Sequence, residues 1–176
     1  MIYGLQDGFD AAVWAWVSRF GQAEVMVPCV IALALWMVWV QAGNRAWVWV
    51  ASLALAAGLT LSSKVAFIGW GLGIASLDFT GISGHAMLSA ATWPVMLSIL
   101  AARFRPAWQR RAVAAGYGLA VLVACSRVVL GLHSPFEVMA GFLLGALASG
   151  VVLGRFRTSH ALTPAWLSIS LALCWR

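Results

Sequence analysis

Residues 136–153 read FEVMAGFLLGALASGVVL, and no charged residue follows Glu137 in this stretch. About 20 predominantly apolar residues in a helix cross the hydrocarbon core of a bilayer, so this run predicts a membrane-spanning helix. Four other apolar runs are of similar length: residues 25–41, 46–62, 86–102 and 112–127. A sixth run, residues 162–175, is shorter and contains Pro164. The chain is therefore predicted to be an all-α integral membrane protein, a compact bundle of five or six transmembrane helices.

The overall composition excludes a soluble globular domain. Of the 176 residues, 63% are hydrophobic and only 9% are charged, whereas about 25% is usual in soluble domains. Five or six crossings use nearly the whole chain, so large extramembrane domains are excluded as well. The net charge of +6 fits loop charges that orient the spans, and no nucleic-acid partner is expected. No pattern specifies an oligomeric state.

Residues 1–24 are predicted to be a lead-in to the bundle, and residues 25–176 a single transmembrane domain. Residues 10–20 alternate apolar and polar positions and include Trp14 and Trp16. This pattern is typical of an amphipathic helix that lies in the membrane interface instead of spanning it.

The distribution of basic residues predicts the orientation of the spans. Because cytoplasmic loops carry an excess of Lys and Arg, the side with seven of the eleven basic residues is expected to be cytoplasmic. The opposite side receives all five acidic residues and the only long connection, residues 63–84, and long connections are typical of functional loops. The seven are Arg45, Arg103, Arg105, Arg110, Arg111, Arg155 and Arg157. The remaining four basic residues are Arg19, Lys64, Arg127 and Arg176.

Polar side chains that are costly inside a bilayer gather at four helix ends on the non-cytoplasmic side. Together they supply two cations, two imidazoles, a hydroxyl and a carboxylate, a set suited to holding and attacking an anionic phosphate. Their residues are Lys64, Ser83, His85, Arg127, His133 and Glu137.

Two of these side chains have a structural interpretation as well as a functional one. Ser83 and Gly84 directly precede an apolar helix, so the hydroxyl and the first-turn N–H groups can face an anion, but Ser83 is equally suited to be an ordinary N-cap. Glu137 stands three residues after Ser134, as in a capping box, and one turn after His133, whose imidazole it can hold. These two roles of Glu137 compete for the same oxygens.

Arg127 is the least expected of the polar residues, since it stands between two apolar segments. A lone Arg near the membrane centre costs about 2.5 to 3.5 kcal/mol on insertion scales. The alternative to a buried position is that the Arg127 side chain extends to the interface, as long cationic side chains commonly do.

Gly141, Gly145 and Ser149, spaced by four, predict a helix-packing face.

These residues resemble the three motifs of the type 2 phosphatidic acid phosphatase family, membrane lipid phosphatases that share a site with vanadium haloperoxidases. The third motif, Ser-Arg, five residues, His, three residues and Asp, is matched from Ser126-Arg127 to Glu137, with Glu for Asp. The second, Pro-Ser-Gly-His, is matched at residues 82–85, with Ile82 for Pro. The first needs Arg-Pro seven residues after a Lys, and Gly71-Leu72 stands there after Lys64. The resemblance covers residues 64–150.

The resemblance implies a phosphatase that needs no metal and no cofactor. His133 is then the nucleophile that forms a phosphohistidine, Glu137 holds it, and His85 is the general acid. The implied phosphate-binding residues are Lys64, Ser83, Gly84 and Arg127.

The implied substrate is a lipid phosphate at the outer face of a bacterial inner membrane, with other membrane lipids as surroundings. Undecaprenyl diphosphate, phosphatidylglycerophosphate and a lipid A phosphate all fit. The absent arginine favours the alternative of a catalytically silent family member that binds or transports a lipid phosphate. A further hypothesis is that the backbone of Gly69, Gly71 or Gly73 takes the place of this arginine.

Overall fold

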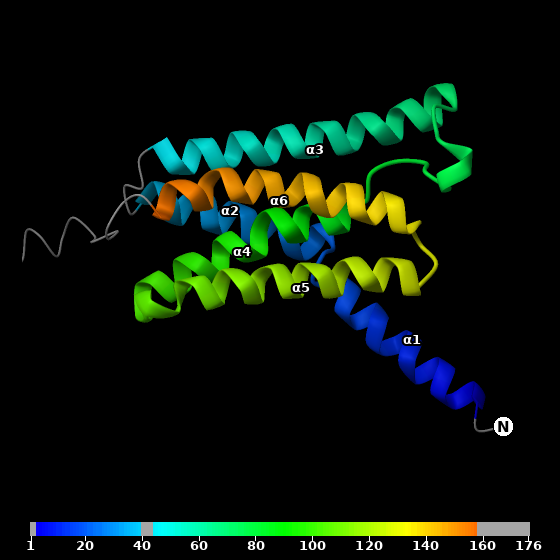
Figure 1. Cartoon of the computed structure of the whole chain (residues 1–176), viewed down its shortest axis with the longest axis horizontal. Helices are drawn as coiled ribbons and strands as arrows, with labels where there is room; N and C mark the ends of the chain where they lie inside the picture. The colour runs from blue at the N-terminus through cyan, green and yellow to red at the C-terminus, as the bar shows by residue number, and fades with distance from the viewer. Residues whose placement is uncertain (1–2, 40–43, 158–176) are drawn as a thin grey trace, which may run out of the picture.

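The computed structural model describes residues 3–39 and 44–157, which form six α-helices and two short 3₁₀ helices (Figure 1). Five helical segments are long and apolar enough to cross a membrane, which confirms the predicted all-α membrane bundle. The predicted sixth run, residues 162–175, lies outside the described residues. The helices are α1 (Tyr3–Arg19), α2 (Ala23–Trp39), α3 (Asn44–Trp70), α4 (Gly84–Phe104), α5 (Gln109–Val129) and α6 (Pro135–Arg157), with η1 (Ala75–Leu77) and η2 (Pro106–Trp108) in the connections.

Helix α4 lies at the centre of the bundle and contacts α2, α3, α5 and α6. Its side chains are largely buried over residues 86–95, whereas α2 and α3 expose large apolar side chains such as Leu35, Trp39 and Leu55. Exposed apolar surface of this kind is what lipid tails cover in a membrane-spanning bundle.

The small residues of α6 allow the close approach of α4. A Cβ atom at Gly141 would collide with the Ser83 carbonyl oxygen, and one at Gly145 with that of Met87. The Ser149 hydroxyl donates a hydrogen bond of 2.8 Å to the Ala90 carbonyl. The packing face predicted from the spacing of these three residues is therefore present, and it presses the N-terminal half of α6 against the start of α4.

Helix α3 is longer than its apolar run predicts. The second apolar run ends at Ser62, but the helix continues to Trp70, because residues 65–68 are apolar and contain no helix breaker. Gly71, with a φ of 65°, then ends the helix in the left-handed conformation that glycine adopts freely. Lys64 consequently lies within α3 and not at its end.

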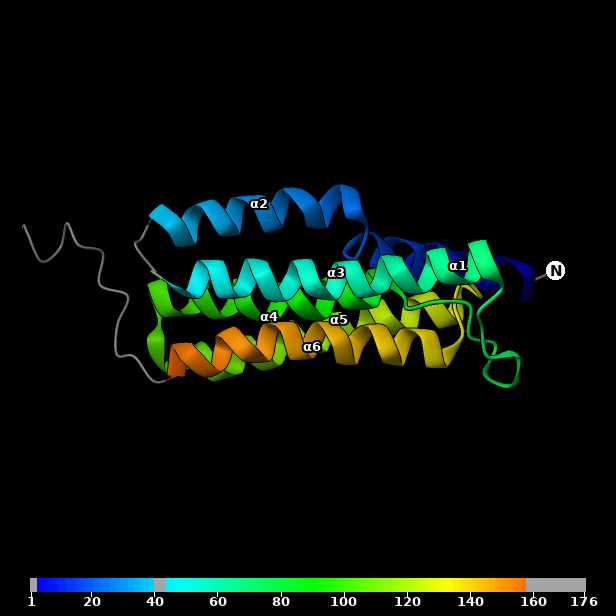
Figure 2. The same ribbon diagram turned by 90° about the horizontal axis from the view of Figure 1, so that it is seen from above.

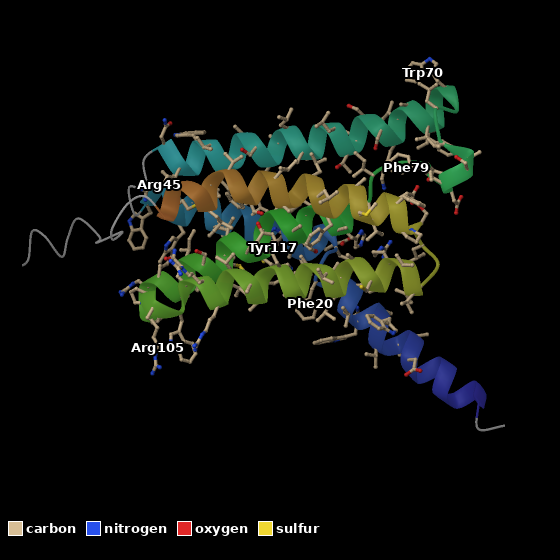
Figure 3. The ribbon with its side chains drawn as sticks, viewed as in Figure 1. Phe20, Arg45, Trp70, Phe79, Arg105 and Tyr117 are labelled. Carbon is tan, nitrogen blue, oxygen red and sulfur yellow. The ribbon has the colours of Figure 1, made fainter. Side chains whose placement is uncertain are left out.

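The two ends of the bundle differ in charge. Arg45 and Arg105 lie at one end, whereas Trp70 and Phe79 lie at the other (Figure 3). The α3–α4 and α5–α6 connections share the second end, and α1 leaves the bundle there at an angle, as Figures 1 and 2 show. The predicted separation of the arginine-rich connections from the polar helix ends is thus present in the fold.

Candidate active site

The turn between α5 and α6 places His133 at the polar end of the bundle. Gly131, with a φ of 65°, follows α5, and the Leu132 N–H donates to the Arg127 carbonyl at 3.0 Å, as in a Schellman motif. Helix α6 then begins with a capping box, since the Ser134 hydroxyl and the Glu137 carboxylate each accept a hydrogen bond from the other's N–H group, both at 3.3 Å. The two caps set the separation of His133 and Glu137.

Glu137 performs both roles that the sequence left open, because its two oxygens divide them. Its Oε2 lies 2.6 Å from Nδ1 of His133 and also accepts the N–H of Ser134. Its Oε1 accepts hydrogen bonds from the N–H and the hydroxyl of Thr80, each at 2.6 Å, and from the N–H of Gly81 at 3.1 Å. The Glu137 side chain is only 4% exposed. This carboxylate therefore joins α6 to the α3–α4 connection and holds the His133 ring.

Ser83 precedes α4, but its side chain is not an ordinary N-cap. The hydroxyl makes no capping hydrogen bond, and it is buried without a hydrogen-bond partner among the described residues. The Ser83 N–H is used instead, since it donates to the Glu137 carbonyl at 3.1 Å. An unpaired buried hydroxyl costs free energy, and the hydroxyls of Thr60, Ser89 and Thr92 are in the same situation among the described residues. The Ser83 hydroxyl therefore keeps its capacity to form a hydrogen bond with another group. Gly84, the next residue, is the first residue of α4.

Arg127 does not extend freely to the interface. Its Nη1 donates a hydrogen bond of 2.8 Å to the hydroxyl of Ser18 on α1, while its Nε is buried and has no partner among the described residues. Neither Arg127 nor Lys64 forms an ion pair with a carboxylate in the described part of the chain. Both positive charges are therefore available to an anion.

The structure brings the predicted residues of all three motifs together. The positive charges of Arg127 and Lys64 act on the His85 imidazole, as does the negative charge of Glu24 near the start of α2, and His133 lies within the same range of it. Lys64 and His133 also line one cavity of about 200 Å³, together with Phe67, Ile68, Thr80 and Gly81. The four elements α3, α4, α5 and α6 thus contribute to one site. It contains two cations, Lys64 and Arg127, and the carboxylate of Glu137, and the carboxylate of Glu24 also acts on His85.

Gly71 stands where the family's first motif has an arginine, and the space beside it is not filled by other side chains. Gly71 has no atom near its Cβ position within 4 Å, but its positive φ strains any other residue there. Among the described residues, Gly69 and Gly73 do not line the cavity that holds Lys64, and neither does Gly71. Thr80 and Gly81 do line this cavity, and their backbone N–H groups already donate to Glu137.

Sequence reasoning missed three contributors. Thr80 lies just before the second motif, but nothing in its spacing indicated that it binds Glu137 from 57 residues away. The Ser63 hydroxyl accepts the Ile82 N–H at 3.0 Å and so ties α3 to the residues before α4. Ser18 carried no signal apart from being a small polar residue in an apolar helix.

Comparisons with known proteins find similar sequences and a similar fold. The model of the PAP2 superfamily matches residues 23–161. An uncharacterized 22.5 kDa protein in the cps region of Klebsiella pneumoniae is 43% identical over 141 residues, which is 80% of this chain and 68% of that protein. Glucose-6-phosphatase 3 of Rattus norvegicus is 35% identical over 103 residues, 53% of this chain but only 30% of that protein.

A solved structure has the same fold. It is the crystal structure of the first transmembrane PAP2 type phosphatidylglycerolphosphate phosphatase from Bacillus subtilis, which superposes with a TM-score of 0.66. The match covers 86% of this chain and 79% of the other, at 21% sequence identity. At this identity the likeness establishes a shared fold alone.

Proposed function

This chain belongs to the PAP2 superfamily, and from this premise we propose that it is a membrane phosphatase that hydrolyses a lipid phosphomonoester or diphosphate through a phosphohistidine on His133. The observation that carries the proposal is the hydrogen bond of 2.6 Å between Nδ1 of His133 and Oε2 of Glu137. When Nδ1 carries the proton and donates it to the carboxylate, the lone pair of Nε2 is free to attack.

In the proposed reaction, Nε2 of His133 attacks the phosphorus atom and forms an N–P bond. The bond from phosphorus to the leaving oxygen breaks, and His85 donates a proton to that oxygen. His85 then removes a proton from water, the resulting hydroxide attacks phosphorus, and the N–P bond breaks. Inorganic phosphate leaves, and both histidines return to their starting protonation states.

Four groups are proposed to bind the phosphoryl oxygens: the side chains of Lys64, Arg127 and Ser83 and the N–H of Gly84. Phosphoryl transfer depends mainly on positioning and on stabilising charge on the equatorial oxygens. The two unpaired cations and the unpaired hydroxyl of Ser83 supply that stabilisation. Mg²⁺ prefers oxygen ligands. The Glu137 carboxylate already accepts five hydrogen bonds, and although the Glu24 carboxylate also acts on His85, the described residues contain no cluster of three or more possible metal ligands. The fixed cations are therefore proposed to act in place of a metal.

The site is proposed to face the non-cytoplasmic side of a bacterial inner membrane. This is supported by the arginine residues at the opposite end of the bundle, since basic residues favour the cytoplasmic side. A site at the end of the spans meets phosphates at the level of the lipid headgroups. The substrate class is therefore a lipid phosphate, with undecaprenyl diphosphate and phosphatidylglycerophosphate as the first two to test.

The proposed function predicts phosphate release by detergent-purified protein from at least one lipid phosphate in a small panel, including a lipid A phosphate. Release should continue in excess EDTA and stop in the His133→Ala variant, because the fixed charges and the imidazole carry the reaction. Inorganic phosphate is measured colorimetrically. Loss of release on chelation, restored by Mg²⁺, would contradict the metal-independent mechanism. Binding of a lipid phosphate without any release would favour the silent binding protein instead.

An arginine introduced beside Lys64 is expected to raise the rate. Ile68 lines the same cavity as Lys64 and His133, lies one helical turn after Lys64, and is 83% exposed. Ile68→Arg therefore adds a cation without the backbone strain of a change at Gly71. We expect kcat/KM to rise about three- to tenfold, which is a part of the rate gain that one well-placed hydrogen-bond donor contributes to catalysis. Ile68→Met, of similar length and uncharged, is the control. Equal rates in the two variants would show that an additional positive charge at this position does not help catalysis.

A further inference from the structure

We propose that Ser18, on α1, is a positioning residue that aims the guanidinium of Arg127 at the bound phosphate. The proposal rests on the proposed function in taking the anion at this site to be a phosphate. Helix α1 lies outside residues 23–161, the part of the chain that matches the family model. The proposed site is therefore completed by a segment that the family match does not include.

The turn after α1 is held firmly against the bundle. The Phe20 carbonyl accepts a hydrogen bond of 3.0 Å from the indole N–H of Trp93 on α4, and the two rings pack edge to face. A Cβ atom at Gly21 would collide with the Val123 side chain on α5 and would lie 2.9 Å from the Ser89 hydroxyl on α4. Because the backbone approaches α4 and α5 this closely, the last turn of α1 has little freedom to move relative to Arg127.

Ser18 occupies the part of this last turn that faces the site. It is only 2% exposed, and its hydroxyl accepts the hydrogen bond from Nη1 of Arg127 at 2.8 Å. A guanidinium is planar with its donors in a rigid fork. Holding Nη1 therefore restricts the plane of the whole group and leaves Nε and Nη2 for other acceptors. The buried Nε has no partner in the described part of the chain.

The chemistry of serine matters to this role. A carboxylate at position 18 would hold Arg127 equally well, but it would also neutralise the positive charge that an anion needs. A hydroxyl is uncharged, so it orients the guanidinium and leaves its charge available. This is significant in a site where Gly71 replaces one of the family's cations.

The test compares inorganic phosphate binding in Ser18→Ala and Ser18→Thr. The dissociation constant is obtained from the rise of the unfolding temperature of detergent-purified protein with phosphate concentration. Ser18→Ala is expected to weaken phosphate binding about tenfold, because the guanidinium of Arg127 is then no longer oriented before phosphate binds. Ser18→Thr, which keeps the hydroxyl, is expected to remain within about twofold of the unmodified protein.

Two further variants separate positioning from general stability. Ser98, also buried, accepts a hydrogen bond from Gln109 at the opposite end of the bundle. Ser98→Ala is therefore expected to lower the unfolding temperature without changing the dissociation constant of phosphate. In an Arg127→Ala background, Ser18→Ala should have no additional effect on phosphate binding, since the two residues act through one contact.

The proposal would be overturned if Ser18→Ala left the dissociation constant of phosphate unchanged, or if the effect were equally large without Arg127. A protein that binds no phosphate would overturn it as well. Phosphate binding that depends on Ser18, in a protein that releases no phosphate from any lipid, would support the Ser18 proposal while contradicting the proposed enzymatic activity. The two failures are thus distinguishable.

Discussion

Replacement of Glu137 with glutamine is expected to lower the rate of phosphate release by about 10³- to 10⁴-fold, similar to the loss when an orienting carboxylate becomes an amide in a catalytic triad. The amide oxygen can still accept the N–H groups of Thr80 and Gly81. The NH₂ group then faces Nδ1 of His133 as a donor, so Nδ1 must accept and the ring proton moves to Nε2. The attacking atom thereby loses its free lone pair.

The measurement is the initial rate of phosphate release together with the unfolding temperature. Glu137→Gln should lower the unfolding temperature only slightly, because the hydrogen bonds to Oε1 are kept and the N–H of Ser134 alone loses its acceptor. Glu137→Ala should also lower the unfolding temperature, since it leaves the buried N–H of Gly81 without its acceptor. Asp10→Asn, which changes an exposed carboxylate on α1, serves as the matched control. A Glu137→Gln variant within tenfold of the unmodified rate would contradict the role assigned to the carboxylate.

The second large effect concerns the division of work between the two histidines. A lipid analogue with a radiolabelled phosphate is expected to leave an acid-labile, alkali-stable label on the protein. His133→Ala should abolish this label completely, because no atom remains to form the N–P bond. His85→Ala should still be labelled by an analogue with a good leaving group, such as a nitrophenyl ester, since that group departs without a proton from the protein.

The release rates should follow the same division. With an alkyl leaving group, His85→Ala is expected to lose about 10² to 10⁴ in rate, the range of general acid catalysis. The loss in the first step should be much smaller with the nitrophenyl ester. His160→Ala, at a histidine outside the motifs, is the control. A label that persists in His133→Ala, or equal losses with both leaving groups in His85→Ala, would contradict the assignment.

Motif spacing alone identified most of the candidate site. His133 and Glu137 lie four residues apart at the start of one helix, and such local separations are set by helix geometry. The structure accordingly brings them within hydrogen-bond distance. Helix ends were less predictable: α3 continues eight residues beyond Ser62, because the apolar pattern weakens there while helix-compatible residues continue up to Gly71.

The sequence by itself determined that this chain is a helical membrane bundle with arginines at one end and a polar site at the other. Hydrophobic run length and charge asymmetry are properties of composition, and a bilayer acts on them directly. Only the tertiary structure decided how Glu137 shares its oxygens, that the Ser83 hydroxyl caps nothing, and that Ser18 holds Arg127. These features depend on where separate helices meet, and Ser18 and Arg127 are 109 residues apart in the chain, so no local pattern records their contact.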